Sequence, residues 1–287
     1  MATHIGIALL VLALACVGLA QQPSSHFAML DGTRVYYEST GKGKEALVFI
    51  HGWSCDHSFW RMQAPVWRKR RSLLIDLPGH GRSDKQELAY TMDHFARGVD
   101  AVMRDAGVER AVLIGHSMGG PVARQVLRHY PRKVKAIVFV DSFLRRVPKD
   151  EAARQKTIEG WKQFVAPLQA PNYKESAAKF IEGMFVEQTP ADLRKDITSK
   201  MTSTPQHVMV TAMQGMADPD LWQEDKAEIP ALAVAAKRKD APAAAGAFIK
   251  SLFPRLEYVE VPGCGHFLML ERPEQFNEIL LGFLKGL

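Results

Sequence analysis

One short stretch, Gly115–Gly119, constrains the fold of this chain more than any other part of its sequence. It follows the apolar run Ala111–Ile114 and precedes an amphipathic segment from Gly120 to about Arg128. A chain that turns from strand to helix within so few residues holds the residue at the turn, Ser117, in a strained backbone conformation. Larger side chains beside it would collide with neighbouring backbone, which favours glycine at both ends. The G-x-S-x-G pattern therefore predicts a strand, a sharp turn and a helix, with the serine hydroxyl exposed near the helix N-terminus.

The rest of the chain supplies a sheet around this turn. From residue 46 onward, short apolar runs alternate with helical patterns, which predicts an α/β fold with a mostly parallel sheet and helices on both faces. Strands are expected at 46–50, 72–75, 111–114, 134–140, 231–236 and 256–261, after a hairpin that turns at Asp31-Gly32. Helices are expected at 92–106, 120–128, 242–252 and 273–284.

The alternation stops between residues 143 and 228, where no strand is expected. Four helical segments separated by prolines are expected there, at 149–168, 173–187, 190–202 and 205–217. This pattern predicts a helical cap, residues 143–228, inserted into a sheet domain made of residues 26–142 and 229–287. The segment is rich in large apolar side chains. Most of them should form the core of the cap, and a minority should line an apolar pocket beneath it.

The first 20 residues contain no Asp, Glu, Lys or Arg and are almost entirely apolar after His4. This pattern predicts a secretory signal peptide, residues 1–20, cleaved after Ala20, and a mature protein that is secreted or periplasmic. Because no Lys or Arg precedes the apolar run, an uncleaved N-terminal membrane anchor is the alternative. An exported chain would keep Cys55 and Cys264, for which an oxidising compartment permits a disulfide, although two unpaired thiols are favoured.

The composition points to an ordinary globular protein. The chain has 287 residues, of which 47% are hydrophobic and 24% charged, enough for one large domain with an insertion. Part of the formal net charge of +6 comes from the run Arg68–Arg71. Since no nucleic-acid motif accompanies it, this run is typical of a solvated loop, and no nucleic-acid partner is expected. No cofactor, no metal and no stable membrane span after cleavage are expected either.

A serine hydroxyl at such a turn is a weak nucleophile and needs a neighbouring base. His266 is the candidate, because it lies in a glycine-rich loop after the last expected strand and before the last helix. A carboxylate must in turn orient the base. Asp240, which follows the expected strand 231–236 by a short loop, is favoured, and Ser117, Asp240 and His266 follow the order of a known triad. Asp141, which directly ends another expected strand, is the alternative.

The negative charge that forms when a serine attacks a carbonyl needs at least two preorganised hydrogen-bond donors. The backbone N–H of Met118, which follows the serine, is expected to be one of them. The backbone N–H of Trp53, in the loop after the strand at 46–50, is expected to be the other. Gly52 beside it allows close backbone approach.

Four motifs in this order resemble the α/β-hydrolase superfamily, from about residue 27 to 287. They are His51-Gly52-Trp53, Asp76-Leu77-Pro78-Gly79-His80-Gly81-Arg82-Ser83, Gly115-His116-Ser117-Met118-Gly119-Gly120 and Gly265-His266-Phe267. The resemblance implies a Ser-His-Asp triad beneath a helical cap, in an esterase-like branch. Haloalkane dehalogenases and epoxide hydrolases of this superfamily use Asp at the turn. Ser117 therefore favours acyl transfer over those two chemistries.

Three functions remain open from the sequence. The favoured one is a secreted serine hydrolase that cleaves a small apolar or aromatic carboxylic ester through an acyl-enzyme. A C–C bond or lactone hydrolase with the same triad is the alternative, and a non-catalytic ligand-binding protein is a third reading. Because His266 must be neutral to accept a proton, activity is expected to fall on acidification.

Overall fold

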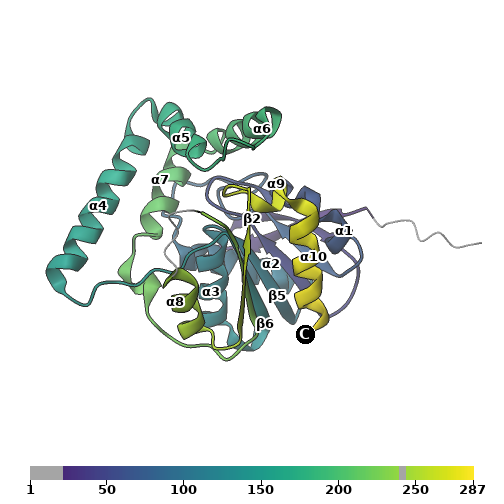
Figure 1. Cartoon of the computed structure of the whole chain (residues 1–287). Coiled ribbons are helices and arrows are strands. Elements are labelled where there is room, and N and C mark those ends of the chain that lie inside the picture. Colours follow the sequence, from purple (N-terminus) through teal and green to yellow (C-terminus); the bar gives the residue numbers. More distant parts are fainter. Residues whose placement is uncertain (1–21, 239–243) are drawn as a thin grey trace, which may run out of the picture.

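The computed structural model describes residues 22–238 and 244–287 (Figure 1). Its centre is an eight-stranded sheet with the order β1-β2-β4-β3-β5-β6-β7-β8. The strands are β1 Ser24–Leu30, β2 Thr33–Thr40, β3 Glu45–Ile50, β4 Ser72–Ile75, β5 Arg110–His116, β6 Val134–Val140, β7 Ala231–Ala236 and β8 Leu256–Val261. Strand β2 runs antiparallel to both of its neighbours, and all other pairs are parallel. The predicted α/β fold with a mostly parallel sheet is confirmed.

Helices cover both faces of this sheet (Figure 1). One face carries α3 (Gly119–His129) and α8 (Ala244–Leu252), with α2 (Met92–Asp105) packed against α3. The other face carries α10 (Pro273–Lys285) and the short α1 (Ala64–Trp67). Because the inner strands are covered on both sides, β3 and β5 carry continuous apolar runs, at residues 46–50 and 111–114, rather than an alternating pattern.

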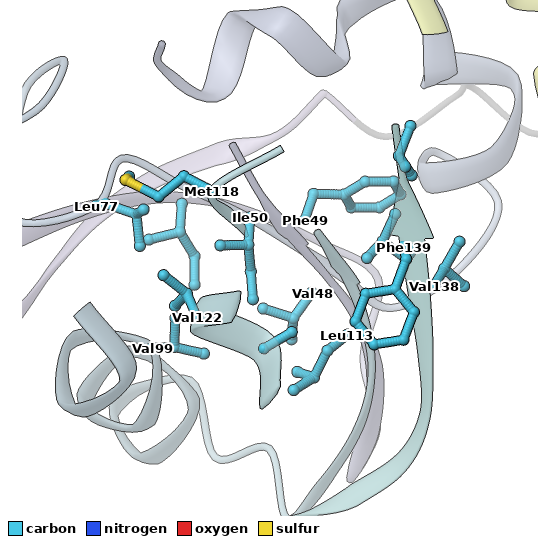
Figure 2. Close-up of a cluster of buried hydrophobic side chains, with 14 of the residues drawn as sticks. Val48, Phe49, Ile50, Leu77, Val99, Leu113, Met118, Val122, Val138 and Phe139 are labelled. Carbon is cyan, nitrogen blue, oxygen red and sulfur yellow. The ribbon is translucent and has the colours of Figure 1, made fainter. Parts of the chain in front are cut away.

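The core lies between the central strands and their helices. Figure 2 shows Val48 and Ile50 of β3 and Leu113 of β5 pointing toward Val99 of α2 and Val122 of α3, and none of these five is exposed to solvent. Burial of such side chains supplies about 1.5–3 kcal/mol each relative to an exposed position. Strands β3 and β5 are therefore anchored in the buried core, and β5 leads directly into the serine turn.

Four helices and a short 3-10 helix connect β6 to β7. They are α4 Glu151–Gln169, α5 Tyr173–Glu182, α6 Ala191–Thr202, α7 Gln206–Gly215 and η3 Pro219–Trp222. Figure 1 shows α4 to α7 (teal to green) standing outside the sheet and its covering helices, beyond one edge of the sheet. The helices begin and end within a few residues of the expected bounds. The main difference is α5, which ends at Glu182 because Gly183 and a turn follow it.

Several short elements were not expected from the sequence. They are η1 His57–Gln63, α1, η2 Pro131–Lys133 and α9 Leu268–Glu271. Each is too short to show a helical period, and η1 depends on a local cap, in which the Asp56 carboxylate accepts the backbone N–H of Ser58 (2.7 Å). Within residues 22–238 and 244–287, no helix combines the length and apolar character needed to cross a bilayer.

Candidate active site

Ser117 occupies the predicted turn between β5 and α3, and its backbone has a positive φ of 51°. Its N–H donates to the Val140 carbonyl (3.0 Å), which ties the turn to β6. A Cβ atom at Gly115 would lie 2.3 Å from the Gly119 carbonyl oxygen, and one at Gly119 would lie 2.4 Å from that of Ile50. The expectation that the turn is strained and needs both glycines is confirmed. The strain presents the serine side chain to the cavity described below.

His266 lies in the loop between β8 and α9, and its imidazole is oriented by a carboxylate. The Nδ1–H donates to Asp141 Oδ2 (2.6 Å). Burial raises the pKa of Asp141, but the hydrogen bond and charge of His266, together with Arg238, outweigh burial and lower it to about 2. Asp141 is therefore an anion at neutral pH and stabilises a positive charge on His266.

Among the described residues, the carboxylate that bonds His266 is Asp141, which was the alternative to Asp240. Asp240 falls outside the described residues. The register explains why Asp141 is placed for this role: His116 pairs with Val140 between β5 and β6, so the next residues, Ser117 and Asp141, leave neighbouring strand ends side by side. The sequence signal for Asp141 is its place directly after an expected strand, and Ser117, Asp141 and His266 follow the same Ser-Asp-His order as the set with Asp240.

The loop that carries His266 is fixed on three sides. The backbone N–H of His266 donates to the Met184 carbonyl in the segment after α5 (2.9 Å), and its own carbonyl accepts His116 Nε2–H (3.0 Å). Burial lowers the pKa of His116 to about 3, so its ring is neutral at neutral pH. Its single N–H is then the Nε2–H that donates to the His266 carbonyl. The buried Glu271 carboxylate accepts the backbone N–H groups of Gly265 (2.9 Å) and Phe267 (3.2 Å).

The two predicted oxyanion donors belong to loops that meet at Ser117. Among the described residues, no acceptor receives the backbone N–H of Trp53 or of Met118. A Cβ at Gly52 would lie 3.1 Å from Ser117 Cβ, so glycine lets the loop approach the serine closely. The Trp53 ring is held by its Nε1–H, which donates to the Met209 carbonyl of α7 (2.9 Å).

A cavity of about 570 Å³ lies between these loops and the helices α4, α5 and α7. Ser117 and His266 share its wall with Trp53 and Arg145. The other lining residues are mostly large and apolar: Phe143, Trp161, Phe164, Phe180, Met184, Phe185, Val186, Met213 and Met216. A pocket of this size and character accommodates a small apolar or aromatic molecule. No hydrogen bond joins Ser117 Oγ to His266 among the described contacts, so proton transfer requires the two side chains to approach on substrate binding.

Comparison with known proteins decides the family. Residues 47–279 match the profile of the Alpha/beta hydrolase family, which is most of the chain. The chain belongs to the alpha/beta hydrolase family. As a member whose relatives are esterases, hydrolases and haloperoxidases, it is a hydrolytic enzyme, and the third, non-catalytic function is set aside.

Three relatives of this hydrolase illustrate the range of the family. The chain is 28% identical to a dihydrolipoyllysine-residue acetyltransferase component of an acetoin cleaving system from Pseudomonas putida, over 93% of this chain and 70% of the relative. It is 27% identical to a pimeloyl-[acyl-carrier protein] methyl ester esterase from Aeromonas hydrophila, over 87% of this chain and 99% of the relative. The solved structure of Est816, described as an N-acyl homoserine lactone degrading enzyme, is similar with 27% identity and a TM-score of 0.74, over 90% of this chain and all of that one.

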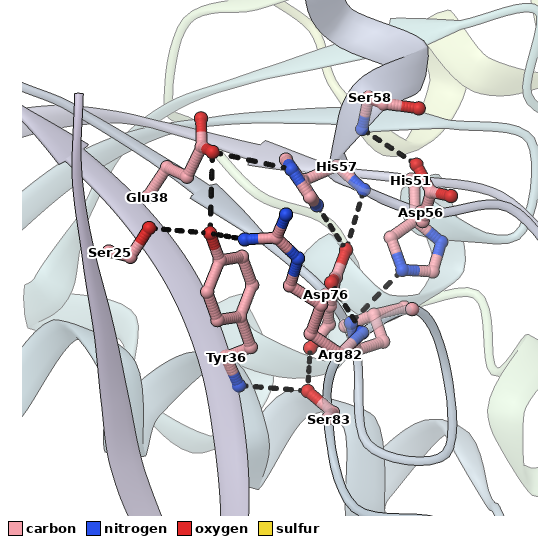
Figure 3. Close-up of polar contacts among 12 residues, drawn as sticks. Ser25, Tyr36, Glu38, His51, Asp56, His57, Ser58, Asp76, Arg82 and Ser83 are labelled. Carbon is pink, nitrogen blue, oxygen red and sulfur yellow. Dashed lines mark hydrogen bonds and ion pairs between the residues drawn. The ribbon is translucent and has the colours of Figure 1, made fainter. Parts of the chain in front are cut away.

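A buried polar network holds the Trp53 loop of the hydrolase in place (Figure 3). His51 accepts the Leu77 N–H at Nε2 (3.0 Å), and burial lowers the pKa of His51 to about 3, so Nε2 stays an acceptor. The Asp76 carboxylate accepts the backbone N–H and the Nδ1–H of His57 (both 2.7 Å) and the backbone N–H of Arg82 (2.8 Å). The network links the loop after β3 to the loop after β4.

Asp56, His57 and Asp76 offer the spacing of a metal site. Their ligand atoms are already engaged, however, because Asp56 caps η1 and the Asp76 oxygen bonds His57 Nδ1–H. We therefore interpret this group as structural. Cys55 and Cys264 are buried free thiols, and burial raises the pKa of each, that of Cys264 to about 11. The disulfide alternative is not found, and neither thiol is a reactive thiolate at neutral pH.

Proposed function

We propose that this hydrolase cleaves carboxylic esters, with Ser117 as nucleophile, His266 as base and Asp141 as the acid that orients the base. The observation that carries the proposal is the 2.6 Å hydrogen bond from His266 Nδ1 to Asp141, with His266 and Ser117 on the wall of one apolar cavity. The bond fixes the tautomer in which Nε2 is free to accept a proton.

In the proposed reaction, Ser117 Oγ attacks the ester carbonyl while His266 Nε2 takes the serine proton. The carbonyl oxygen becomes an anion that accepts hydrogen bonds from the backbone N–H groups of Trp53 and Met118. The C–O bond then breaks, and His266 returns the proton to the leaving alcohol. A water molecule, deprotonated by His266, attacks the acyl-enzyme and releases the acid and the free serine.

The test is turnover of short-chain p-nitrophenyl esters by the wild type and by Ser117→Ala. The wild type should release p-nitrophenol, and Ser117→Ala should lose activity by about 10⁴-fold or more, because nothing else can form the acyl-enzyme. Retention of activity by Ser117→Ala, with the fold checked by circular dichroism, would contradict the mechanism. A folded wild type that is inert toward a broad ester panel would contradict the substrate class.

A lactone is the second candidate substrate, because a lactone is a cyclic ester that the same steps open. The likeness to Est816 over 90% of this chain favours it. Parallel assays with acyl homoserine lactones, vinylogous diketones and simple esters separate lactone, C–C bond and ester hydrolysis. The substrate with the highest kcat/KM then identifies the activity.

We also propose that the protein acts outside the cytoplasm, after cleavage behind Ala20. The support is the uncharged apolar composition of residues 1–20. Expression of the full chain, fractionation and N-terminal sequencing test it. A mature chain that begins at Gln21 supports export, whereas an intact N-terminus in the soluble cytoplasmic fraction contradicts it.

A further inference from the structure

Among the described residues, the Arg, Lys, Asp and Glu side chains on the cavity wall are of one sign. The described lining residues include two guanidinium groups, Arg145 and Arg238, and no Asp or Glu. Arg238 is neutralised by Asp141, whose Oδ2 accepts its Nη2–H at 2.5 Å. The positive charge of Arg145 therefore needs an explanation of its own.

Arg145 has no acidic or hydrogen-bonding partner among residues 22–238 and 244–287. Aromatic rings hold it instead: its guanidinium carbon lies 4.3 Å from the centre of the Trp161 ring, 5.6 Å from Trp222 and 5.7 Å from Phe143. Burial lowers its pKa, but arginine stays charged at neutral pH. Stacking orients a guanidinium without neutralising it and leaves the N–H groups at its rim free to donate.

The next residue shows what an ordinary surface arginine does in this segment. Arg146 is exposed, does not line the cavity, and pairs with Glu224 (3.2 Å). Arg145 is thus distinguished by position rather than by residue type. A charged, preoriented guanidinium that has no acidic partner among the described residues, in an apolar pocket, matches a carboxylate, which accepts two parallel N–H bonds from arginine.

We propose that Arg145 binds a carboxylate carried by the substrate, so that the preferred esters are anionic, with the carboxylate on either the acyl or the alcohol side. This inference rests on the proposed esterase function and deepens it. On binding, the substrate carboxylate would replace its bound water with Arg145, and no Asp or Glu of the described wall competes for that guanidinium. Arg145 would then fix the substrate while Ser117, on the same wall, attacks the ester carbonyl.

A purely structural role is the competing explanation, because Arg145 contacts both Trp161 of the cap and Trp222 of η3. The two explanations differ in substrate dependence. If Arg145 only holds these elements together, its loss lowers stability and lowers kcat/KM for every substrate by a similar factor. Loss of a carboxylate-binding residue weakens turnover of anionic substrates more than that of their neutral partners.

The experiment compares kcat/KM within matched pairs of charged and neutral esters. The pair 4-acetoxybenzoate and 4-acetoxybenzamide places the charge on the alcohol side. The pair p-nitrophenyl hydrogen glutarate and its monoamide places it on the acyl side. The wild type should favour the charged member of at least one pair by about tenfold or more, and Arg145→Met should abolish that preference by lowering kcat/KM for the charged member far more than for the neutral one. The control Arg146→Met should keep the preference.

Direct binding separates this inference from the proposed function. Calorimetry of 4-acetoxybenzoate with Ser117→Ala and with Ser117→Ala/Arg145→Met needs no turnover. Loss of affinity in the double variant supports the carboxylate site even if no ester is hydrolysed. Esters hydrolysed without charge preference, a preference that persists in Arg145→Met, or equal losses on both members of a pair would overturn the inference and leave the esterase proposal standing.

Discussion

Asp141 is the residue on which the proposed chemistry depends most closely, and its surroundings explain why. Its backbone leaves β6 with a positive φ of 38°, which turns the side chain back toward the sheet edge. Oδ1 accepts the Ala236 N–H (2.8 Å), and Oδ2 accepts both His266 Nδ1–H and an Arg238 N–H. The carboxylate is thereby immobilised by two strands and by Arg238, and it holds the imidazole in one orientation.

The assignment of Asp141 gives the first prediction. Asp141→Asn should lower kcat/KM for a p-nitrophenyl ester by about 10³–10⁴-fold, because an amide can fix the wrong tautomer of His266 and cannot stabilise its cation. Asp240→Asn should stay within about twofold of the wild type. Circular dichroism of both variants controls for folding. A collapse of activity in Asp240→Asn with a normal Asp141→Asn would contradict this assignment and favour Asp240 as the acid.

A candidate functional residue could be identified from the sequence where only one structural role explains that residue type at its position. Ser117 could be identified because the glycines around it are required by the turn, and His266 because its loop ends the sheet. The acid could not be chosen in the same way. Two aspartates follow two strands, and only the register that sets β6 beside β5 decides which carboxylate reaches the imidazole.

At the scale of elements, hydrogen bonds to Glu271 connect the His266 loop to the cap. Its Oε2 accepts the Gly265 N–H and the Thr189 hydroxyl (both 2.9 Å), and its Oε1 accepts the Phe267 N–H. Thr189 lies between α5 and α6 of the cap. One buried carboxylate therefore fixes the backbone on both sides of His266 and ties it to the cap.

Glu271 is accordingly a positioning residue, and the second prediction concerns it. Glu271→Gln should lower kcat by about tenfold or more with little change in KM, because the amide turns an N–H group toward one of the donors and displaces the His266 loop. Thr189→Val removes the bond from the cap to Glu271, together with the bond that the Thr189 hydroxyl accepts from the Val186 N–H (3.1 Å). It should cost about 1 kcal/mol of stability and keep most of kcat. Equal kcat losses in the two variants would contradict a specific role at the His266 loop.

Long elements were predictable from the sequence and short ones were not. The cap helices could be predicted because prolines separate segments that are long enough for their apolar residues to show a helical period. The helix α9, which carries Glu271, has four residues, so neither a period nor a cap marks it. The role of its carboxylate follows only from the folded structure, in which it accepts the backbone N–H groups of Gly265 and Phe267 and the hydroxyl of the distant Thr189.

For the whole molecule, the sequence could predict a parallel sheet but not the order of its strands. Apolar runs show that strands are buried, whereas the order depends on crossovers that leave no local signal. That order places β2 beside β4, and so brings the first hairpin against the loops of the active-site side. The polar network of Figure 3 joins them: His57 of η1 lies between Asp76 after β4 (2.7 Å) and Glu38 of β2 (3.5 Å).

This arrangement makes global stability depend on pH, which is the third prediction. Burial lowers the pKa of His57, but the hydrogen bond and charge of Asp76, with Glu38 and Asp56, outweigh burial and raise it. A raised folded-state pKa stabilises the fold fully below the unfolded value of about 6.5, and the contribution is lost as pH rises through the folded value. Urea unfolding from about pH 5.5 to about pH 8.5 should therefore show the stability advantage of the wild type over His57→Gln shrinking as pH rises.

A histidine with the opposite shift provides the matched control. Burial lowers the pKa of His94 in α2, so its folded form binds protons less readily than the unfolded chain. The advantage of the wild type over His94→Gln should grow with pH, since the unfolded state then loses its excess of bound protons. Opposite slopes for the two variants would show that Asp76 and Glu38 act on His57 as an ionised cluster. Parallel slopes would show that burial alone governs both rings, and the network would then join the hairpin to the sheet through neutral hydrogen bonds.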